Sequence, residues 1–132
     1  MMKYKTANFY LIAFGLFLLI LTACAGSSDK PAQTVELYYQ ALIGKDQDRL
    51  VNLSCSDWEA TALMTLDSFG NVEASLIDFA CETINDEGAA AKVTCEGAIS
   101  ATYDGEAREF SLSEQNYLVI QEGGEWRMCG YE

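Results

Sequence analysis

The chain has 132 residues and a formal net charge of −12 at pH 7, with 20 acidic and 8 basic residues. This charge argues against nucleic acid as a partner and against lying flat on anionic lipid, because both negative surfaces attract Lys and Arg. There are five cysteines and no histidine, which rules out a Ser–His–Asp triad and argues against a Cys/His zinc site. The sequence also has no glycine-rich phosphate loop, so we expect no metal or other cofactor.

The N-terminus has the pattern of an export signal. Lys3 and Lys5 precede an apolar run from Phe9 to Leu21. A signal-peptide core has about 7–15 apolar residues and a bilayer-spanning helix needs about 20, so the run is short for a permanent span. An uncleaved membrane anchor is the alternative. In both cases we expect the rest of the chain to be exported and tethered.

The segment from Leu21 to Cys24 reads Leu-Thr-Ala-Cys and resembles the lipobox of bacterial lipoproteins. The resemblance implies that residues 1–23 are a lipoprotein signal peptide and that Cys24 becomes the lipidated (palmitate-bearing) first residue. Residues 24–30 would then be the lipidated cysteine and a tether, and residues 31–132 a single extracytoplasmic domain anchored to a membrane of the bacterial cell envelope. Because the removed part carries two lysines and no acid, the net charge would change from −12 to −14.

Four further cysteines follow, at Cys55, Cys81, Cys95 and Cys129. An even number of cysteines in a small exported domain is typical of disulfides, and four cysteines allow three connectivities. No two of them form a Cys-x-x-Cys pair, so a thioredoxin-like redox site is not expected.

Two helices are predicted before Ser54. Apolar side chains recur at helical spacing between Pro31 and Ile43, and Gly44 would end this helix. They are Val35, Tyr38, Tyr39, Leu42 and Ile43. Asp46 has the character of an N-cap for a short second helix that reaches Leu53.

A third helix is predicted from a capping-box pattern. Ser56 and Glu59 have the Ser-x-x-Glu spacing in which each side chain bonds the backbone of the other, and the helix would end at Gly70. Its apolar stripe consists of Trp58, Ala62, Leu66 and Phe69.

From Val72 the apolar period changes to two, which predicts strands. The first strand carries Ile77, Phe79 and Cys81 on one face, and the second carries Val93, Cys95, Ile99, Ala101 and Tyr103. Asp104-Gly105 predicts a tight turn. We expect a third strand from Ala107 to Leu112 with Phe110 and Leu112 inward, a fourth from Tyr117 to Gln121 and a last from Glu125 to Tyr131 after Gly123-Gly124.

The first two strands predict a disulfide pairing. A hairpin folded symmetrically about Gly88 places Cys81 opposite Cys95, Phe79 opposite Gly97, and Ile77 opposite Ile99. Opposed strand residues lie about 4.5–5.5 Å apart at Cα, which a disulfide accepts. We therefore predict the pair Cys81–Cys95, which leaves Cys55–Cys129.

Helices followed by hairpin-linked strands predict an α+β fold with N-terminal helices on one face of a curved antiparallel sheet. The segment from Thr34 to Asp46, with its Tyr-x-Ala-Leu run, and the ending from Gly123 to Cys129 resemble the nuclear transport factor 2-like (cystatin-like) superfamily, a cone-shaped fold. The resemblance implies a pocket in the cone. Its candidate lining residues are Tyr38, Tyr39, Trp58, Tyr103 and Tyr117. For Tyr38, Tyr39 and Trp58 the helical spacing favours a core position, and the pocket is the alternative.

Enzymes of that superfamily use Asp, Tyr and often His inside the cone, but this chain has no histidine and no carboxylate that the pattern places beside a tyrosine. We therefore expect no catalytic residue. The hypothesis that follows is a lipid-anchored, non-enzymatic binding or interaction module with a protein or small-molecule partner. The alternative is a cyclase or isomerase type of enzyme, which would need a buried carboxylate near a tyrosine.

Overall fold

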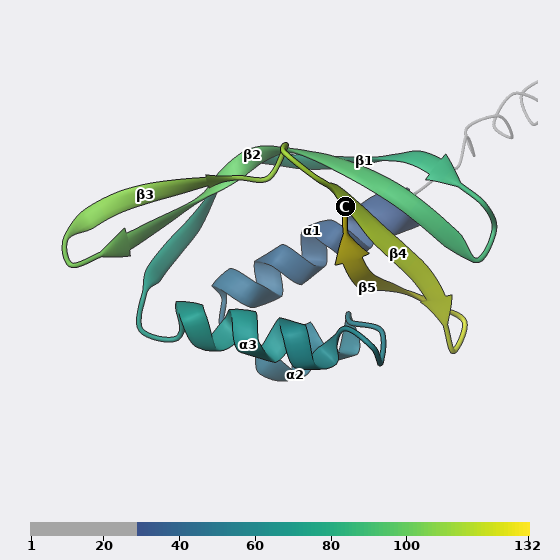
Figure 1. The fold of residues 1–132 in the computed structure, drawn as a ribbon, viewed down its shortest axis with the longest axis horizontal. Helices are drawn as coiled ribbons and strands as arrows, with labels where there is room; N and C mark the ends of the chain where they lie inside the picture. Colours follow the sequence, from purple (N-terminus) through teal and green to yellow (C-terminus); the bar gives the residue numbers. More distant parts are fainter. Residues whose placement is uncertain (1–28) are drawn as a thin grey trace, which may run out of the picture.

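The computed structural model describes residues 29–132, and Figure 1 shows them as three helices beneath an arched sheet. The predictions for residues 1–28, including Cys24, lie outside the described residues. The elements are α1 (Lys30–Ile43), α2 (Gln47–Asn52), α3 (Glu59–Phe69), β1 (Glu73–Asp86), β2 (Ala90–Tyr103), β3 (Glu106–Ser111), β4 (Asn116–Glu122) and β5 (Glu125–Tyr131). No helix of the described part is long and apolar enough to cross a membrane.

The first two helices begin where their caps predict. The Asp29 carboxylate accepts the Ala32 N–H, and Pro31 lies in the first turn of α1. Asp46 caps α2 by accepting the Arg49 N–H at 3.1 Å. α1 begins at Lys30, one residue before the predicted start at Pro31, and Asp29 is its N-cap.

The capping box predicted for α3 is wrong. The helix begins at Glu59 with Trp58 at its N-cap, and no side chain caps it. Ser56 instead bonds to a strand: its hydroxyl and its N–H both donate to the Glu122 carboxylate of β4, at 2.7 and 3.0 Å. These two bonds lower the pKa of the Glu122 carboxyl below its usual value. Ser56 therefore bonds Glu122, 66 residues away in the sequence, in place of the backbone of Glu59.

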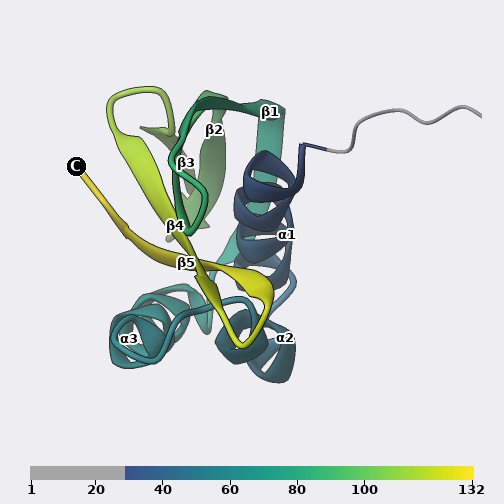
Figure 2. The ribbon, with the colours of Figure 1, turned by 90° about the vertical axis from the view of Figure 1, so that its right-hand side faces the viewer.

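The sheet is antiparallel and β2 is its central strand. β1 pairs along one side of β2, while β3 and β4 pair with opposite ends of its other side and β5 pairs with β4. Figure 1 shows the sheet arching over α1, with the β2–β3 hairpin and the β4–β5 hairpin at opposite ends. In Figure 2, α1 lies alongside the sheet, with α2 and α3 beyond its C-terminal end.

The predicted register of the first hairpin is correct at the disulfide and wrong on both sides of it, because the ladder shifts between Thr83 and Asn85 and again between Ile77 and Ala80. Cys81 lies opposite Cys95, but Ile77 pairs with Ala98 rather than Ile99, because a bulge separates Ile77 from Ala80. Two residues of β1 there face only Gly97, whose φ is +93°. A Cβ at that position would lie 2.3 Å from the Ile77 carbonyl oxygen, so only glycine fits this bulge.

The third strand differs from its prediction at its inward side chains. Leu112 is buried as expected, but it follows β3 rather than belonging to it, and Phe110 is 44 % exposed. Every residue of β3 is exposed. The strand pairs only with the end of β2 that extends past the helices, so nothing among the described residues covers it.

Candidate binding site

The interior between α1 and the sheet is filled by aromatic side chains. Tyr38, Tyr39 and Tyr117 are 3 %, 7 % and 0 % exposed. The Tyr39 ring meets those of Tyr117 and Phe79 edge-on, with centroids 5.6 and 5.7 Å apart. Burial and the nearby Tyr117 raise the pKa of the Tyr39 hydroxyl far above its usual value, so this hydroxyl stays neutral. These tyrosines pack as core side chains.

The other two predicted pocket residues lie elsewhere. Trp58 is half-buried; its indole N–H donates to the Tyr38 hydroxyl at 3.2 Å and its ring meets Tyr131 edge-on. Burial raises the pKa of the Tyr38 hydroxyl, although this hydrogen bond acts in the opposite direction. Tyr103 stands on the β2–β3 hairpin, beneath the Arg108 guanidinium and beside Phe110. The five predicted residues therefore do not line one pocket.

The described residues instead line a cleft of about 330 Å³ between α1 and the β4–β5 turn. Its lining has three apolar side chains, those of two leucines and the half-buried Trp126, and five polar ones, of which one is positive and one negative. The lining residues are Lys30, Gln33, Thr34, Leu37, Asn52, Leu53, Gly124, Glu125 and Trp126. The cleft therefore offers both apolar contact and hydrogen-bonding groups to a ligand.

Arg127 joins two of the segments that line this α1–β5 cleft, the end of α2 and the β4–β5 turn. Its guanidinium donates to the Asn52 carbonyl at 2.7 Å and to the Glu125 carboxylate at 3.3 Å. It thereby joins the end of α2 to the β4–β5 turn across 75 residues of sequence. The third lining segment is α1, whose helical spacing places Lys30, Gln33 and Leu37 on one face.

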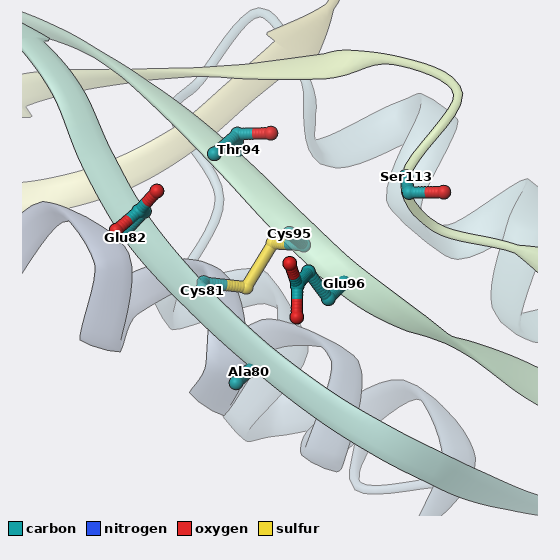
Figure 3. Close-up of a pocket in the computed structure, with 7 residues that line it drawn as sticks. All are labelled: Ala80, Cys81, Glu82, Thr94, Cys95, Glu96 and Ser113. Atoms are coloured by element: carbon teal, nitrogen blue, oxygen red, sulfur yellow. A yellow bond between two sulfur atoms is a disulfide. The ribbon is translucent and has the colours of Figure 1, made fainter.

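A second cleft, of about 340 Å³, lies over the ladder of β1 and β2. Figure 3 shows the Cys81–Cys95 disulfide crossing between the strands, with the Glu82 and Glu96 carboxylates on either side and Ser113 at the margin. Residues 29–132 contain no group of three or more His, Cys, Asp or Glu side chains that could hold a metal ion.

A third hollow, of about 250 Å³, separates α1 from the outer edge of β1. The Glu36 carboxylate accepts the Cys81 N–H at 3.0 Å, and the Asp29 carboxylate accepts the Thr83 N–H at 2.9 Å. Partial burial of Asp29 raises its pKa, but the hydrogen bonds from Thr83 and Ala32 outweigh this and leave the pKa lowered. Because both carboxylates already bond the strand, this hollow is a packing joint, and the α1–β5 cleft is the better candidate site.

Sequence reasoning missed the α1–β5 cleft for an identifiable reason. Lys30, Gln33, Thr34 and Leu37 form a half-polar stripe at helical spacing, and that pattern is visible in the sequence. Nothing local shows that the β4–β5 turn, about 90 residues later, packs against the stripe. Trp126 was predicted as a strand residue and not as part of a site.

The two disulfides are those predicted. Cys81 bonds Cys95 across β1 and β2, and Cys55 bonds Cys129 of β5, with Cα atoms 4.1 and 5.3 Å apart. Such bonds persist in oxidising compartments, so they indicate an extracytoplasmic location for this domain.

No family model matches the chain, and no curated protein is significantly similar to it. Several solved structures share its fold. A putative ketosteroid isomerase from Shewanella frigidimarina superposes with a TM-score of 0.56 at 11 % identity, covering 80 % of this chain and 95 % of that chain. A nuclear transport factor 2-like protein with a cystatin-like fold from Novosphingobium aromaticivorans has a TM-score of 0.54 at 13 % identity, covering 78 % and 77 %.

A SEC-C motif-containing protein from Rhodopseudomonas palustris gives a TM-score of 0.53 at 14 % identity, covering 79 % of this chain and 78 % of that chain. At such identities the likeness concerns the fold alone. The chain thus has the nuclear transport factor 2-like, cystatin-like α+β fold that the sequence pattern predicted. The fold hosts both enzymes and binding proteins, so it does not decide the activity.

Proposed function

We propose that this protein is an exported, lipid-anchored binding module that holds a partner at the outer side of a bacterial membrane and catalyses no reaction. The observation that carries the proposal is the interior of the cone. Tyr38, Tyr39 and Tyr117 fill it with their rings, so a partner is left with the surface. The disulfides and the lipobox-like segment ending at Cys24 support the location.

The α1–β5 cleft is the proposed binding site. Its three apolar side chains, together with Lys30 and Glu125, suit a small molecule or short peptide segment with an apolar part and polar ends. The cleft includes Lys30, which is the last residue of the proposed tether and the first residue of α1. A lipid anchor at Cys24 would therefore hold the cleft close to the membrane surface.

The enzyme alternative requires a carboxylate buried beside a tyrosine. Across residues 29–132, the buried polar side chains are Thr34 and Ser54, and every Asp and Glu is half-buried or exposed. Both buried hydroxyls donate to carbonyls of their own helices, at 3.0 and 2.8 Å. This supports the non-catalytic proposal, because the enzyme alternative needs a carboxylate that is buried beside a tyrosine.

The anchor is tested by expressing the full chain and its Cys24→Ala variant in a bacterium. Lipidation predicts that the wild type partitions into detergent and carries an acylated Cys24 at its N-terminus by mass spectrometry. The variant should keep its leader and lose the acyl mass. An unmodified Cys24 in the membrane-bound wild type would contradict the anchor and favour an uncleaved span.

The cleft is tested by native mass spectrometry of the oxidised protein purified from its own cells. We expect a retained small molecule that Trp126→Ala removes and Trp58→Ala keeps. Trp58 is a matched control, because it is the only other tryptophan, is also half-buried and lines none of the three clefts described above. A bound mass that survives Trp126→Ala, or no bound mass, would contradict the cleft as a small-molecule site.

A further inference from the structure

The sheet has three outer edges, and other parts of the chain bond to some backbone groups on two of them. Along β1, the Glu36 and Asp29 carboxylates accept the outward N–H groups of Cys81 and Thr83. Covering an edge in this way stops it from pairing with another chain.

The edge of β5 is covered by the segment before α3. The Cys55 N–H donates to the Met128 carbonyl at 2.8 Å, and the Met128 N–H donates to the Leu53 carbonyl at 2.7 Å. Ser54 forms a parallel bridge with Met128, and the Cys55–Cys129 disulfide fastens the segment there.

The third edge belongs to β3 and has no such cover among residues 29–132. The two-residue turn at Asp104-Gly105 makes Tyr103 and Glu106 the first hydrogen-bonded pair of the hairpin. Hydrogen-bonded pairs alternate along an antiparallel ladder, so the backbone groups of Ala107, Glu109 and Ser111 point outward. No backbone hydrogen bond beyond the β2 ladder joins any of these three residues.

The charge on this edge selects among possible occupants. Glu109 is one of the three outward-bonding residues, and Glu106 flanks them; Arg108 points to the opposite face from Glu109. Residues 29–132 contain 20 acidic and 6 basic residues, a net charge of −14. Two copies would therefore repel each other, and a symmetric pair centred on Glu109 or on Arg108 would place like charges opposite each other.

We propose that the outer edge of β3 takes up an extended, cationic segment of a partner protein as an added strand. The backbone of Ala107, Glu109 and Ser111 would pair with the segment, and Lys or Arg side chains of the segment would lie beside Glu106 and Glu109. This site is separate from the α1–β5 cleft, and either can exist without the other.

The probe for this site is a labelled peptide that alternates Lys and Val, with an otherwise equal Glu and Val peptide as the charge control. Binding is followed by fluorescence anisotropy against the oxidised domain at about 150 mM salt, where long-range attraction is screened. We expect the cationic peptide to bind and the acidic peptide not to bind. Absence of binding by the cationic peptide overturns the proposal.

Two substitutions at one position separate backbone pairing from charge. Glu109→Gln keeps the outward N–H and removes the charge, and Glu109→Pro removes both while leaving the bonds to β2 in place. We expect Glu109→Gln to weaken binding about threefold and Glu109→Pro at least about tenfold. Equal weakening by the two variants would show a charge contact without strand addition and would overturn the proposal.

A modified peptide makes the test independent of how the variants fold. N-methylation of alternate peptide nitrogens removes every donor on one edge of the added strand. We expect one of the two methylation phases to abolish binding to the wild type and the other to leave it nearly unchanged. Equal binding by both methylated peptides overturns strand addition. Unchanged peptide binding by Trp126→Ala would show that the site is not the α1–β5 cleft.

Discussion

The two disulfides differ chiefly in the length of chain that they close, which allows their contributions to stability to be compared. The Cys55–Cys129 bond joins residues 74 positions apart, and the Cys81–Cys95 bond joins residues 14 positions apart. The other contributions nearly cancel. Each bond has one fully buried sulfur, at Cys55 and Cys95, which are both 1 % exposed, and one half-buried partner. Replacing either pair by alanine should therefore remove a similar amount of packing.

The shorter bond lies inside the longer loop and shortens it. With Cys81–Cys95 intact, the chain between Cys55 and Cys129 is reduced from 74 by 14 residues, to about 60. The chain-entropy model then assigns about 3.0 kcal/mol to Cys81–Cys95 and about 4.3 kcal/mol to Cys55–Cys129. In the double variants each surviving bond acts alone: the 74-residue loop contributes about 4.5 kcal/mol and the 14-residue loop about 3.0 kcal/mol, so the Cys55→Ala/Cys129→Ala variant should be less stable by about 1.5 kcal/mol.

Urea unfolding under non-oxidising, non-reducing conditions measures this difference through circular dichroism. For a domain with an m-value of about 1.3 kcal/mol/M, the two midpoints should differ by about 1 M urea, with both below the wild type. Equal midpoints, or a lower midpoint for Cys81→Ala/Cys95→Ala, would refute the loop-length reasoning. That result would mean that native packing around one bond outweighs the effect on the unfolded chain.

Three further predictions concern single residues. Gly97→Ala should lower the free energy of unfolding in urea by more than about 3 kcal/mol, because the added Cβ meets backbone oxygens. Gly88→Ala is the control, since Gly88 also has a positive φ but open space around it, and should cost about 1 kcal/mol. Similar losses of unfolding free energy in the two variants would contradict the close packing at the bulge. Asp29→Asn should weaken the bonds from Thr83. The pKa of Asp29 is lowered in the folded protein, so the stability that its negative charge adds is fully present above pH 3.8. This stability is lost as the pH falls through the folded pKa. The melting temperatures of Asp29→Asn and wild type should therefore converge in acid, and a gap that persists there would contradict this. Tyr117→Phe should lose about 1 kcal/mol of unfolding free energy, since its buried hydroxyl donates at 2.9 Å to a carbonyl, and no loss would contradict that bond's contribution.

Features that depend on a few neighbouring residues were predictable from the sequence. The Asp46 cap, the turn at Asp104-Gly105 and the period change at Val72 placed the elements close to where the structure has them. The pairing of Cys81 with Cys95 was also predicted from a hairpin symmetric about Gly88, although a register shift between Thr83 and Asn85 separates this pair from the turn. Once that pair was assigned, the remaining disulfide required no spatial information.

The same local reasoning failed where a distant group competed with a near one. Ser56 and Glu59 have the spacing of a capping box, but the Glu122 carboxylate of β4 takes both Ser56 donors. The bulge at Gly97 shifted the register past the disulfide, although a glycine inside a strand pattern was the available signal for it. Phe110 was predicted to lie in the core from its alternation, but it is 44 % exposed and belongs to β3, all of whose residues are exposed.

The sequence by itself determined the fold class, the two disulfides and the acidic character of the domain, because these follow from periodicity, pairing near a turn and composition. Only the tertiary structure decided whether the tyrosines line a pocket or fill the core, and which sheet edge stays open. Helical spacing places Tyr38 and Tyr39 on one face but does not show how closely Tyr117 and Phe79 approach from the sheet. The α1–β5 cleft and the free edge of β3 likewise depend on contacts between distant segments, which a linear pattern does not contain.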